Sequence, residues 1–224
     1  MEHFPVTRTE RGLRVEGFPD AVKIVRLNGA VAQRIADLAL HRWDLDFADS
    51  CLDAINKVPE DPPIIRQALW HCAVIHFIKC FDKTSKARSE LSTDHVYHGE
   101  PPVAMEIFNY FRNLRRKHLV HDENAYAQSL PAAILNGGNK HYKIEKIVCL
   151  DVLGETLEQE NFSNLKRLID RARAWVDAEF DKLCDTLTKD LEREAYQDLL
   201  AREDLILRVP TVDEISKTRK KVSK

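Results

Sequence analysis

The sequence predicts an all-α protein: an antiparallel helical bundle into which one β-hairpin is inserted at about residues 130–150. Three observations lead to this fold class. Of the 224 residues, 44% are hydrophobic and 31% are charged, which is ordinary for a soluble chain rich in helix. Only seven glycines are present, and this disfavours an all-β fold with many tight turns. Apolar residues recur every three or four positions along most of the chain, whereas one segment alternates as a strand does.

The first helix is predicted between residues 29 and 58, after an N-terminal arm that spans residues 1–28. The arm mixes charges with short apolar pieces, so we expect it to be irregular or to hold one short strand. Within the helix, apolar side chains such as Ile35 and Leu38 follow the helical period. The segment Pro59–Pro63 ends it, because proline cannot continue a helix.

The second helix is predicted between residues 63 and 81. It is apolar nearly all round, which is typical of a buried central helix. Residues 82–100 are polar and predict a loop or a broken helix. Pro101 and Pro102 then open a third helix, since proline is tolerated in a first turn.

The β-hairpin is predicted after the third helix, where the helical spacing of apolar residues gives way to a strand-like pattern. Two apolar segments, residues 132–136 and 142–148, flank Gly137–Asn139, a sequence typical of a hairpin turn. Tyr142 and Ile144 alternate with charged neighbours, which predicts a strand with one buried face.

The chain is expected to return to helix from residue 155 to about residue 205. Apolar side chains recur there at helical spacing, and such a stripe needs a partner within the bundle or in a second subunit. Residues 29–205 are therefore interpreted as a single helical domain. Residues 206–224 form a basic C-terminal tail that we expect to be mobile.

Composition narrows the classes of function. The net charge of −2 gives no overall attraction to nucleic acid, so any such binding must come from a local patch. Five scattered cysteines, without paired spacing, favour a reducing compartment. No signal peptide and no apolar run of about 18 residues is seen, so a cytoplasmic protein without a membrane partner is expected. Glycine-rich nucleotide-binding motifs are not found either.

One short segment at the end of the third helix concentrates cations and histidines. Four cations within six residues and two histidines precede the first acidic residue: Arg112, Arg115, Arg116, Lys117, His118 and His121. Arginine offers a planar fork of donors to phosphate, and histidine can move a proton near neutral pH. On an ideal helix His118 continues the packed face and His121 lies close beside it. Arg115 falls on the boundary of that face.

These residue types suit RNA cleavage without a metal ion. A base removes the proton of the ribose 2′-hydroxyl, which attacks the adjacent phosphorus. An acid protonates the departing 5′-oxygen, and a cation stabilises the charge that develops on the phosphoryl oxygens. The expected products carry a 2′,3′-cyclic phosphate and a 5′-hydroxyl. No metal or other cofactor is expected.

The segment also resembles the signature of the HEPN superfamily, in which an arginine is followed after four to six residues by a histidine. Arg115 and His121 match best, with the apolar pair before the histidine; Arg116 stands where the family often has asparagine or aspartate. A second register pairs Arg116 with His121, and a third pairs Arg112, followed by the favoured asparagine, with His118.

The resemblance implies a fold, an activity and partners. HEPN proteins are small helical bundles that usually form homodimers, and the two motifs share one cleft. Many are metal-independent endoribonucleases of toxin–antitoxin or phage-defence systems, so an antitoxin or nucleotidyltransferase partner is conceivable on this basis. The resemblance assigns Arg115 to the scissile phosphate and His121 to general acid–base catalysis. Substrate binding then falls to the four remaining residues: Arg112, Arg116, Lys117 and His118.

Two other interpretations of the function stay open. The chain could be a non-catalytic HEPN-like module that binds RNA, a nucleotide or a protein, or a helical adaptor whose cations are solvated surface. Residues 122–124 are better explained as a cap or turn after the third helix than as metal ligands. Cys72, His76 and Cys80 follow a helical spacing, but a straight helix cannot wrap all three around one tetrahedral zinc ion.

Overall fold

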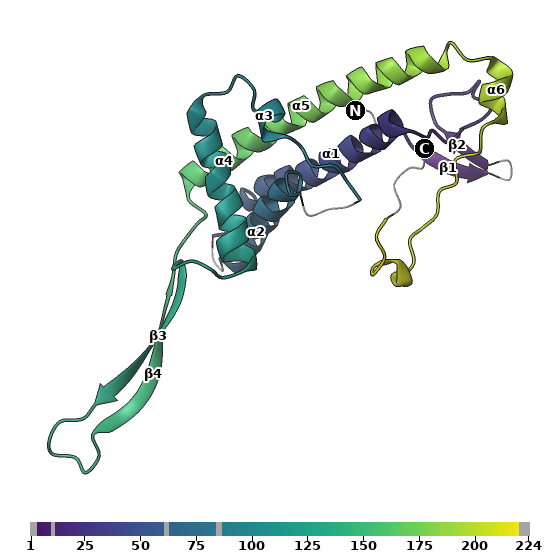
Figure 1. The fold of residues 1–224 in the computed structure, drawn as a ribbon. Helices are drawn as coiled ribbons and strands as arrows, with labels where there is room; N and C mark the ends of the chain where they lie inside the picture. Colours follow the sequence, from purple (N-terminus) through teal and green to yellow (C-terminus); the bar gives the residue numbers. More distant parts are fainter. Residues whose placement is uncertain (1–3, 10–11, 61–62, 84–86, 220–224) are drawn as a thin grey trace. The chain divides into compact units, whose positions relative to one another are not determined.

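The computed structural model describes residues 4–9, 12–60, 63–83 and 87–219, and 52% of the chain is helical. The elements follow one another as shown in Figure 1. They are β1 (Val6–Thr9), β2 (Gly12–Val15), α1 (Ala30–Ile55), α2 (Ile64–Lys79), α3 (Thr93–Val96), α4 (Pro102–Leu114), the π-helical turn η1 (Arg115–Val120), β3 (Ala127–Leu135), β4 (Ile144–Leu153), α5 (Gln159–Leu191), α6 (Tyr196–Ala201) and the 3₁₀ turn η2 (Val212–Glu214). The prediction of a mostly helical chain with a hairpin near residues 130–150 is confirmed at this level.

The chain divides into two compact units. The first contains residues 1–46, 80–98 and 171–224, and the second contains residues 47–79 and 99–170. Helices α1 and α5 therefore each contribute one part to the first unit and the other part to the second. None of the described helices is both long enough and apolar enough to cross a membrane.

The core of the second unit is built from aromatic side chains on α2 and α4. The rings of Trp70 and Phe111 meet edge to face with centroids 5.9 Å apart, and those of Phe77 and Phe108 repeat this arrangement at 5.9 Å. All four are essentially inaccessible to solvent. Edge-to-face pairs add to the free energy of apolar burial, so they fix α2 against α4.

The first unit buries a polar stripe of α1 together with apolar side chains. Asp37, His41 and Asp44 lie on one face of the helix and are at most 1% exposed. Each finds a partner in the segment 87–89: Asp37 accepts from the Ser89 backbone N–H at 3.0 Å, and Asp44 pairs with Arg88 at 2.7 Å. Buried carboxylates need such partners, because their desolvation is costly.

Several sequence predictions need correction. The second helix is not apolar and buried throughout, because Ile64 and Ile65 in its first turn are 64% and 52% exposed. Part of the N-terminal arm pairs as the two-stranded β1–β2 sheet instead of one strand. The final helical stretch is interrupted after Leu191 and resumes at Tyr196.

The inserted hairpin pairs β3 with β4 in antiparallel register, from Ala127 opposite Leu153 to Leu135 opposite Ile144. Figure 1 shows the two strands as a ribbon that leaves the helices of the same unit. The prediction that one face is buried is wrong, since Tyr142 and Ile144 are 52% and 50% exposed. In the C-terminal tail, residues 220–224 lie outside the described part of the chain.

Candidate functional site

The cationic segment does not continue α4 as an α-helix; it forms the π-helical turn η1. The turn ends where Asp122 adopts a left-handed backbone, with a φ of 49°. The Glu123 N–H then donates to the Lys117 carbonyl at 2.6 Å, and Asn124 accepts from the Tyr126 N–H at 3.1 Å. These bonds confirm the cap or turn predicted for residues 122–124. Single π-helical turns inside or at the end of α-helices occur often at functional sites.

The burial of the motif follows its predicted placement on the helix at every residue except His121. Arg112, Arg116 and Lys117 are exposed, while Arg115 is half-buried. His118 continues the buried face and is also half-buried, and its Nδ1 is inaccessible to solvent, with no hydrogen-bond partner among the described residues. His121 is exposed and follows the turn as its C-cap residue.

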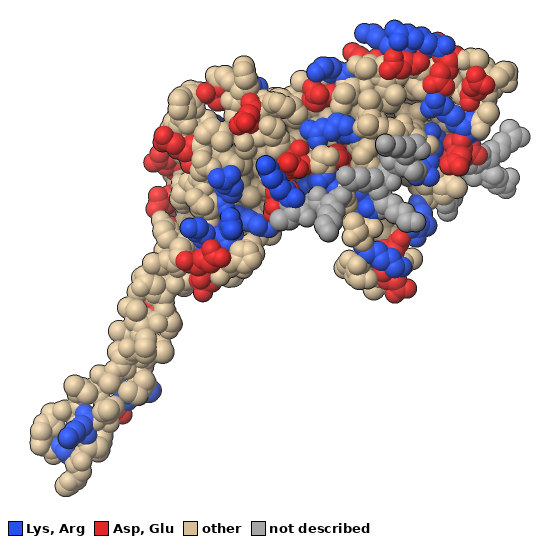
Figure 2. Space-filling model, viewed as in Figure 1, with Lys and Arg blue, Asp and Glu red and all other residues tan. Residues whose placement is uncertain are grey.

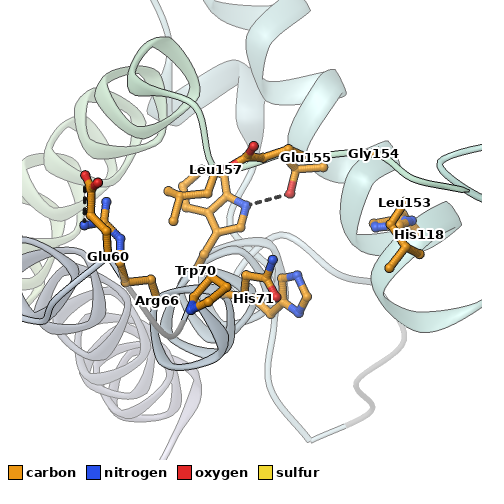
Figure 3. A pocket seen from close by; sticks show the side chains of 12 residues that line it. Glu60, Arg66, Trp70, His71, His118, Leu153, Gly154, Glu155 and Leu157 are labelled. Atoms are coloured by element: carbon orange, nitrogen blue, oxygen red, sulfur yellow. Dashed lines mark hydrogen bonds and ion pairs between the residues drawn. The ribbon is translucent and has the colours of Figure 1, made fainter.

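A pocket of about 410 Å³ lies within the second unit, between α2, η1 and the segment that connects β4 to α5. Figure 3 shows its lining side chains. Of the motif residues, His118 lines this pocket and Arg115 and His121 do not. The lining includes six polar residues besides His118: Glu60, Arg66, Gln67, His71, Glu155 and Thr156. The structure thus brings His118 together with His71 and Arg66 of α2.

Three hydrogen bonds, one buried and two partly buried, hold the segment that connects β4 to α5. The indole N–H of Trp70 donates to the Thr156 hydroxyl at 3.0 Å, drawn as a dashed line in Figure 3. The Asn161 side-chain amide donates to the Thr156 carbonyl at 3.0 Å and to the Tyr110 hydroxyl at 3.1 Å. These hydrogen bonds make the segment between β4 and α5 rigid, so that a ligand could bind in the pocket without rearranging it.

The fourth side of the site is formed by the base of the hairpin. The ring of Tyr126 meets the His118 ring edge to face, with centroids 5.8 Å apart. It also lies over Gly154, where an added Cβ would stand 2.5 Å from the ring. Glycine is therefore required at residue 154 for the tyrosine to reach the histidine.

The electrostatics of the pocket keep His71 in its neutral form. Burial lowers the pKa of His71, and the nearby His118 lowers it further. A neutral imidazole can accept a proton at physiological pH. Arg66 supplies a cation at the same pocket, where it pairs with the largely exposed Glu60 at 3.8 Å.

Sequence reasoning overlooked His71 as a site residue. It lies on another helix, 47 positions before His118, and no spacing rule connects the two. Only the packing of α2 against η1 brings both to one pocket. The alternative zinc stripe is not assembled: Cys72 is exposed, Cys80 is buried, and the His76 ring packs on Phe47 at 4.4 Å. Within the described residues, no cluster of three or more potential metal ligands occurs.

Comparison of the chain with models of known protein families, with curated proteins and with solved structures finds no match.

Proposed function

We propose that the chain is a metal-independent endoribonuclease of the HEPN type, with its reacting phosphodiester bound in the pocket between α2 and η1. The observation that carries the proposal is that His71 and His118, from different elements, line one pocket beside a guanidinium, that of Arg66. Cleavage of RNA by its own 2′-hydroxyl needs a base, an acid and a cation, and this pocket offers one of each.

We assign His71 as the base, because its burial lowers its pKa and so favours the unprotonated ring that can accept a proton. It takes the 2′-hydroxyl proton while the 2′-oxygen forms a bond to phosphorus. His118 gives a proton to the 5′-oxygen as the phosphorus–oxygen bond to that atom breaks. Arg66 stabilises the charge on the phosphoryl oxygens, and the products are a 2′,3′-cyclic phosphate and a 5′-hydroxyl.

The exposed cations of the motif support binding of the rest of the RNA strand. Arg112, Arg116 and Lys117 are all solvent-accessible on or beside η1. Because the net charge of the chain is −2, this local cluster is what attracts phosphate. Figure 2 shows blue side chains gathered near the helical base of the hairpin.

The test is RNA cleavage in EDTA by the wild-type protein and by single variants. We expect His71→Ala and His118→Ala each to lower the rate by about 10²–10⁴-fold, the usual contribution of general acid–base catalysis. His95→Ala, an exposed histidine of the other unit, is the matched control and should keep the wild-type rate. An RNA with 2′-deoxyribose at the cleaved position should resist cleavage by the wild type and by His95→Ala, because it lacks the attacking hydroxyl.

The cleavage rate of His121→Ala distinguishes catalysis by the pocket residues from catalysis by the pair Arg115 and His121. If cleavage depends on His121 and Arg115 but not on His71 and His118, the active residues are the pair that matches the family signature, and the pocket assignment is wrong. Cleavage that requires an added divalent ion would refute the metal-independent mechanism.

A further inference from the structure

Exposed cations gather at both ends of the β3–β4 hairpin, within the second unit. The base cluster consists of Arg112, Arg116 and Lys117, which are exposed on or beside η1. The tip cluster consists of Lys143 and Lys146, which are exposed on or beside β4. None of these side chains forms an ion pair with another residue that the structure describes, so their charges are available to an anionic ligand.

The shaft of the hairpin between the two clusters carries little charge. Its exposed side chains are largely apolar, as at Leu130 and Leu150, although Asp151 is exposed among them. At the tip, Glu145 pairs with Lys140 at 2.7 Å, which leaves the tip cluster uncompensated. Carboxylates near the base follow η1 or β4 and do not lie on the turn itself: Asp122, Glu123, Glu155 and Glu158. Phosphate is therefore attracted at η1 and at the tip, and Figure 2 shows the blue tip beyond a shaft that is almost entirely tan.

The length of the strands sets the distance between the pocket and the tip. At the base, Gly154 lines the pocket and its backbone N–H donates to the Tyr126 carbonyl at 2.7 Å. At the tip, the backbone N–H of Asn136 donates to the Lys143 carbonyl at 2.8 Å. The ten residues from Tyr126 to Asn136 span about 33 Å, at about 3.3 Å per residue. The tip cluster therefore lies about one turn of a nucleic acid duplex away from the pocket.

We propose that the substrate is an RNA whose unpaired cleavage site lies at the end of a stem of about ten base pairs. The unpaired nucleotide enters the pocket, the base cluster binds the phosphates beside it, and the tip cluster binds phosphates at the far end of the stem. Unpaired nucleotides suit a pocket, because they can leave the stack without breaking base pairs. This proposal rests on the proposed function, since the pocket is where the RNA is cut.

The spacing of the two clusters favours a stem over a single strand. A duplex of this length is stiff, so it presents phosphates to both clusters without a cost in conformational entropy. A single strand has to be held extended to span the same distance, and its lost freedom offsets part of the gain from the lysines. The RNA recognised by this surface is therefore one that carries a stem next to the cleaved nucleotide.

Contacts between lysine and phosphate can be counted from the salt dependence of binding. Each contact contributes about 0.9 to the slope of the logarithm of the binding constant against the logarithm of the salt concentration. Loss of both lysines of the tip cluster should therefore lower this slope by about 1.8. At about 0.15 M salt, the same relation gives a loss of affinity of about thirtyfold.

Binding is measured by fluorescence anisotropy with two stem–loop RNAs that share one unpaired extension and have stems of about ten and about five base pairs. Deoxyribose throughout the extension prevents cleavage. We expect Lys143→Gln combined with Lys146→Gln to weaken binding of the long stem about thirtyfold and to leave binding of the short stem unchanged. The matched control combines Lys189→Gln with Lys217→Gln, two exposed lysines of the first unit. It removes the same charge and should leave both affinities unchanged.

Three results would overturn the proposal. An unchanged affinity of the tip variant for the long stem would mean that the tip does not contact the RNA. An equal loss for both stems would mean that the tip lysines attract RNA of any shape. A single strand of the same length that binds as tightly as the long stem would mean that the duplex is not recognised.

Cleavage of the same two RNAs with ribose throughout separates this proposal from the proposed function. The tip variant should raise KM for the long stem and leave kcat unchanged, because the tip does not touch the reacting groups. If the long stem binds through the tip cluster but is not cleaved, the proposed function fails and the contact between tip and stem stands. If the wild type cleaves both RNAs with equal kcat/KM, the proposal of a stem fails and the proposed function stands.

Discussion

Acid should destabilise the first unit through one buried histidine, His41. This side chain is fully buried, and its Nε2 lies 2.8 Å from the Ser89 carbonyl oxygen. Since a carbonyl only accepts, Nε2 carries the proton of the neutral ring. Nδ1 is inaccessible to solvent and has no hydrogen-bond partner among the described residues, so a second proton there would be a buried, unsatisfied charge.

The pKa of His41 is lowered accordingly, from 6.5 to about 4. Burial is the largest cause; the positive charges of Arg88 and Arg34 add to it, whereas the Ser89 hydrogen bond and Asp37 oppose it. The unfolded chain therefore binds this proton at a higher pH than the folded chain does. The stabilisation is present above pH 6.5 and is lost as the pH falls through 4. Between pH 7 and pH 4.5 the loss amounts to about 2.5 kcal/mol of unfolding free energy.

Urea unfolding of wild type and His41→Leu, followed by circular dichroism at both pH values, measures this loss. At pH 7 we expect the variant to be less stable by about 1 kcal/mol, because the hydrogen bond to Ser89 is lost. At pH 4.5 the order should reverse, since leucine takes up no proton. Titration of the His41 ring by NMR gives the pKa directly.

Two results would refute this reasoning. One is a parallel decline of both proteins between pH 7 and pH 4.5, which would assign the acid sensitivity to other groups. The other is an imidazole that titrates near 6.5 in the folded protein, which would mean that the ring is solvated.

The helices could be predicted because their determinants are local. The spacing of Ile35 and Leu38 and the proline-rich break after residue 58 predicted α1 to within three residues at each end. Gly137 and Gly138 predicted the hairpin turn for the same reason: glycine tolerates tight turns. The exposed first turn of α2 could not be predicted, because apolar side chains at helical spacing do not reveal what covers them.

The candidate site was only partly accessible to sequence reasoning. His118 could be placed on the packed face of the third helix from its spacing to Phe111 and Leu114. The π-helical turn changes a hydrogen-bond register and leaves no composition signal, so the position of His121 beyond it was not predicted. His71 depends on packing between distant segments, which a single sequence does not encode in any spacing.

Three further outcomes test the packing. Arg88→Met removes the 2.7 Å ion pair of the buried Asp44 and should cost about 3 kcal/mol in urea unfolding; a loss below about 1 kcal/mol would mean that water replaces the arginine. Thr156→Val leaves the buried indole N–H of Trp70 without its 3.0 Å acceptor and should cost about 1–3 kcal/mol, and unchanged indole N–H exchange would contradict it. Gly154→Ala should displace the tyrosine ring above it, seen as altered ring-current shifts of the neighbouring histidine protons.

The hairpin and the pocket are connected through Gly154, which pairs with Tyr126 at the base of the hairpin and also lines the pocket. The Gly154–Tyr126 bond extends the β-ladder one pair beyond the strands, to the residue that contacts His118. Two residues further along, Thr156 is held by the buried Trp70. A displacement of the hairpin therefore reaches the pocket wall through the Gly154–Tyr126 backbone hydrogen bond and the Trp70–Thr156 side-chain hydrogen bond. A substitution that displaces the Tyr126 ring should uncouple the hairpin from the pocket. The strands β3 and β4 should still pair, while the pocket loses the contact between Tyr126 and His118.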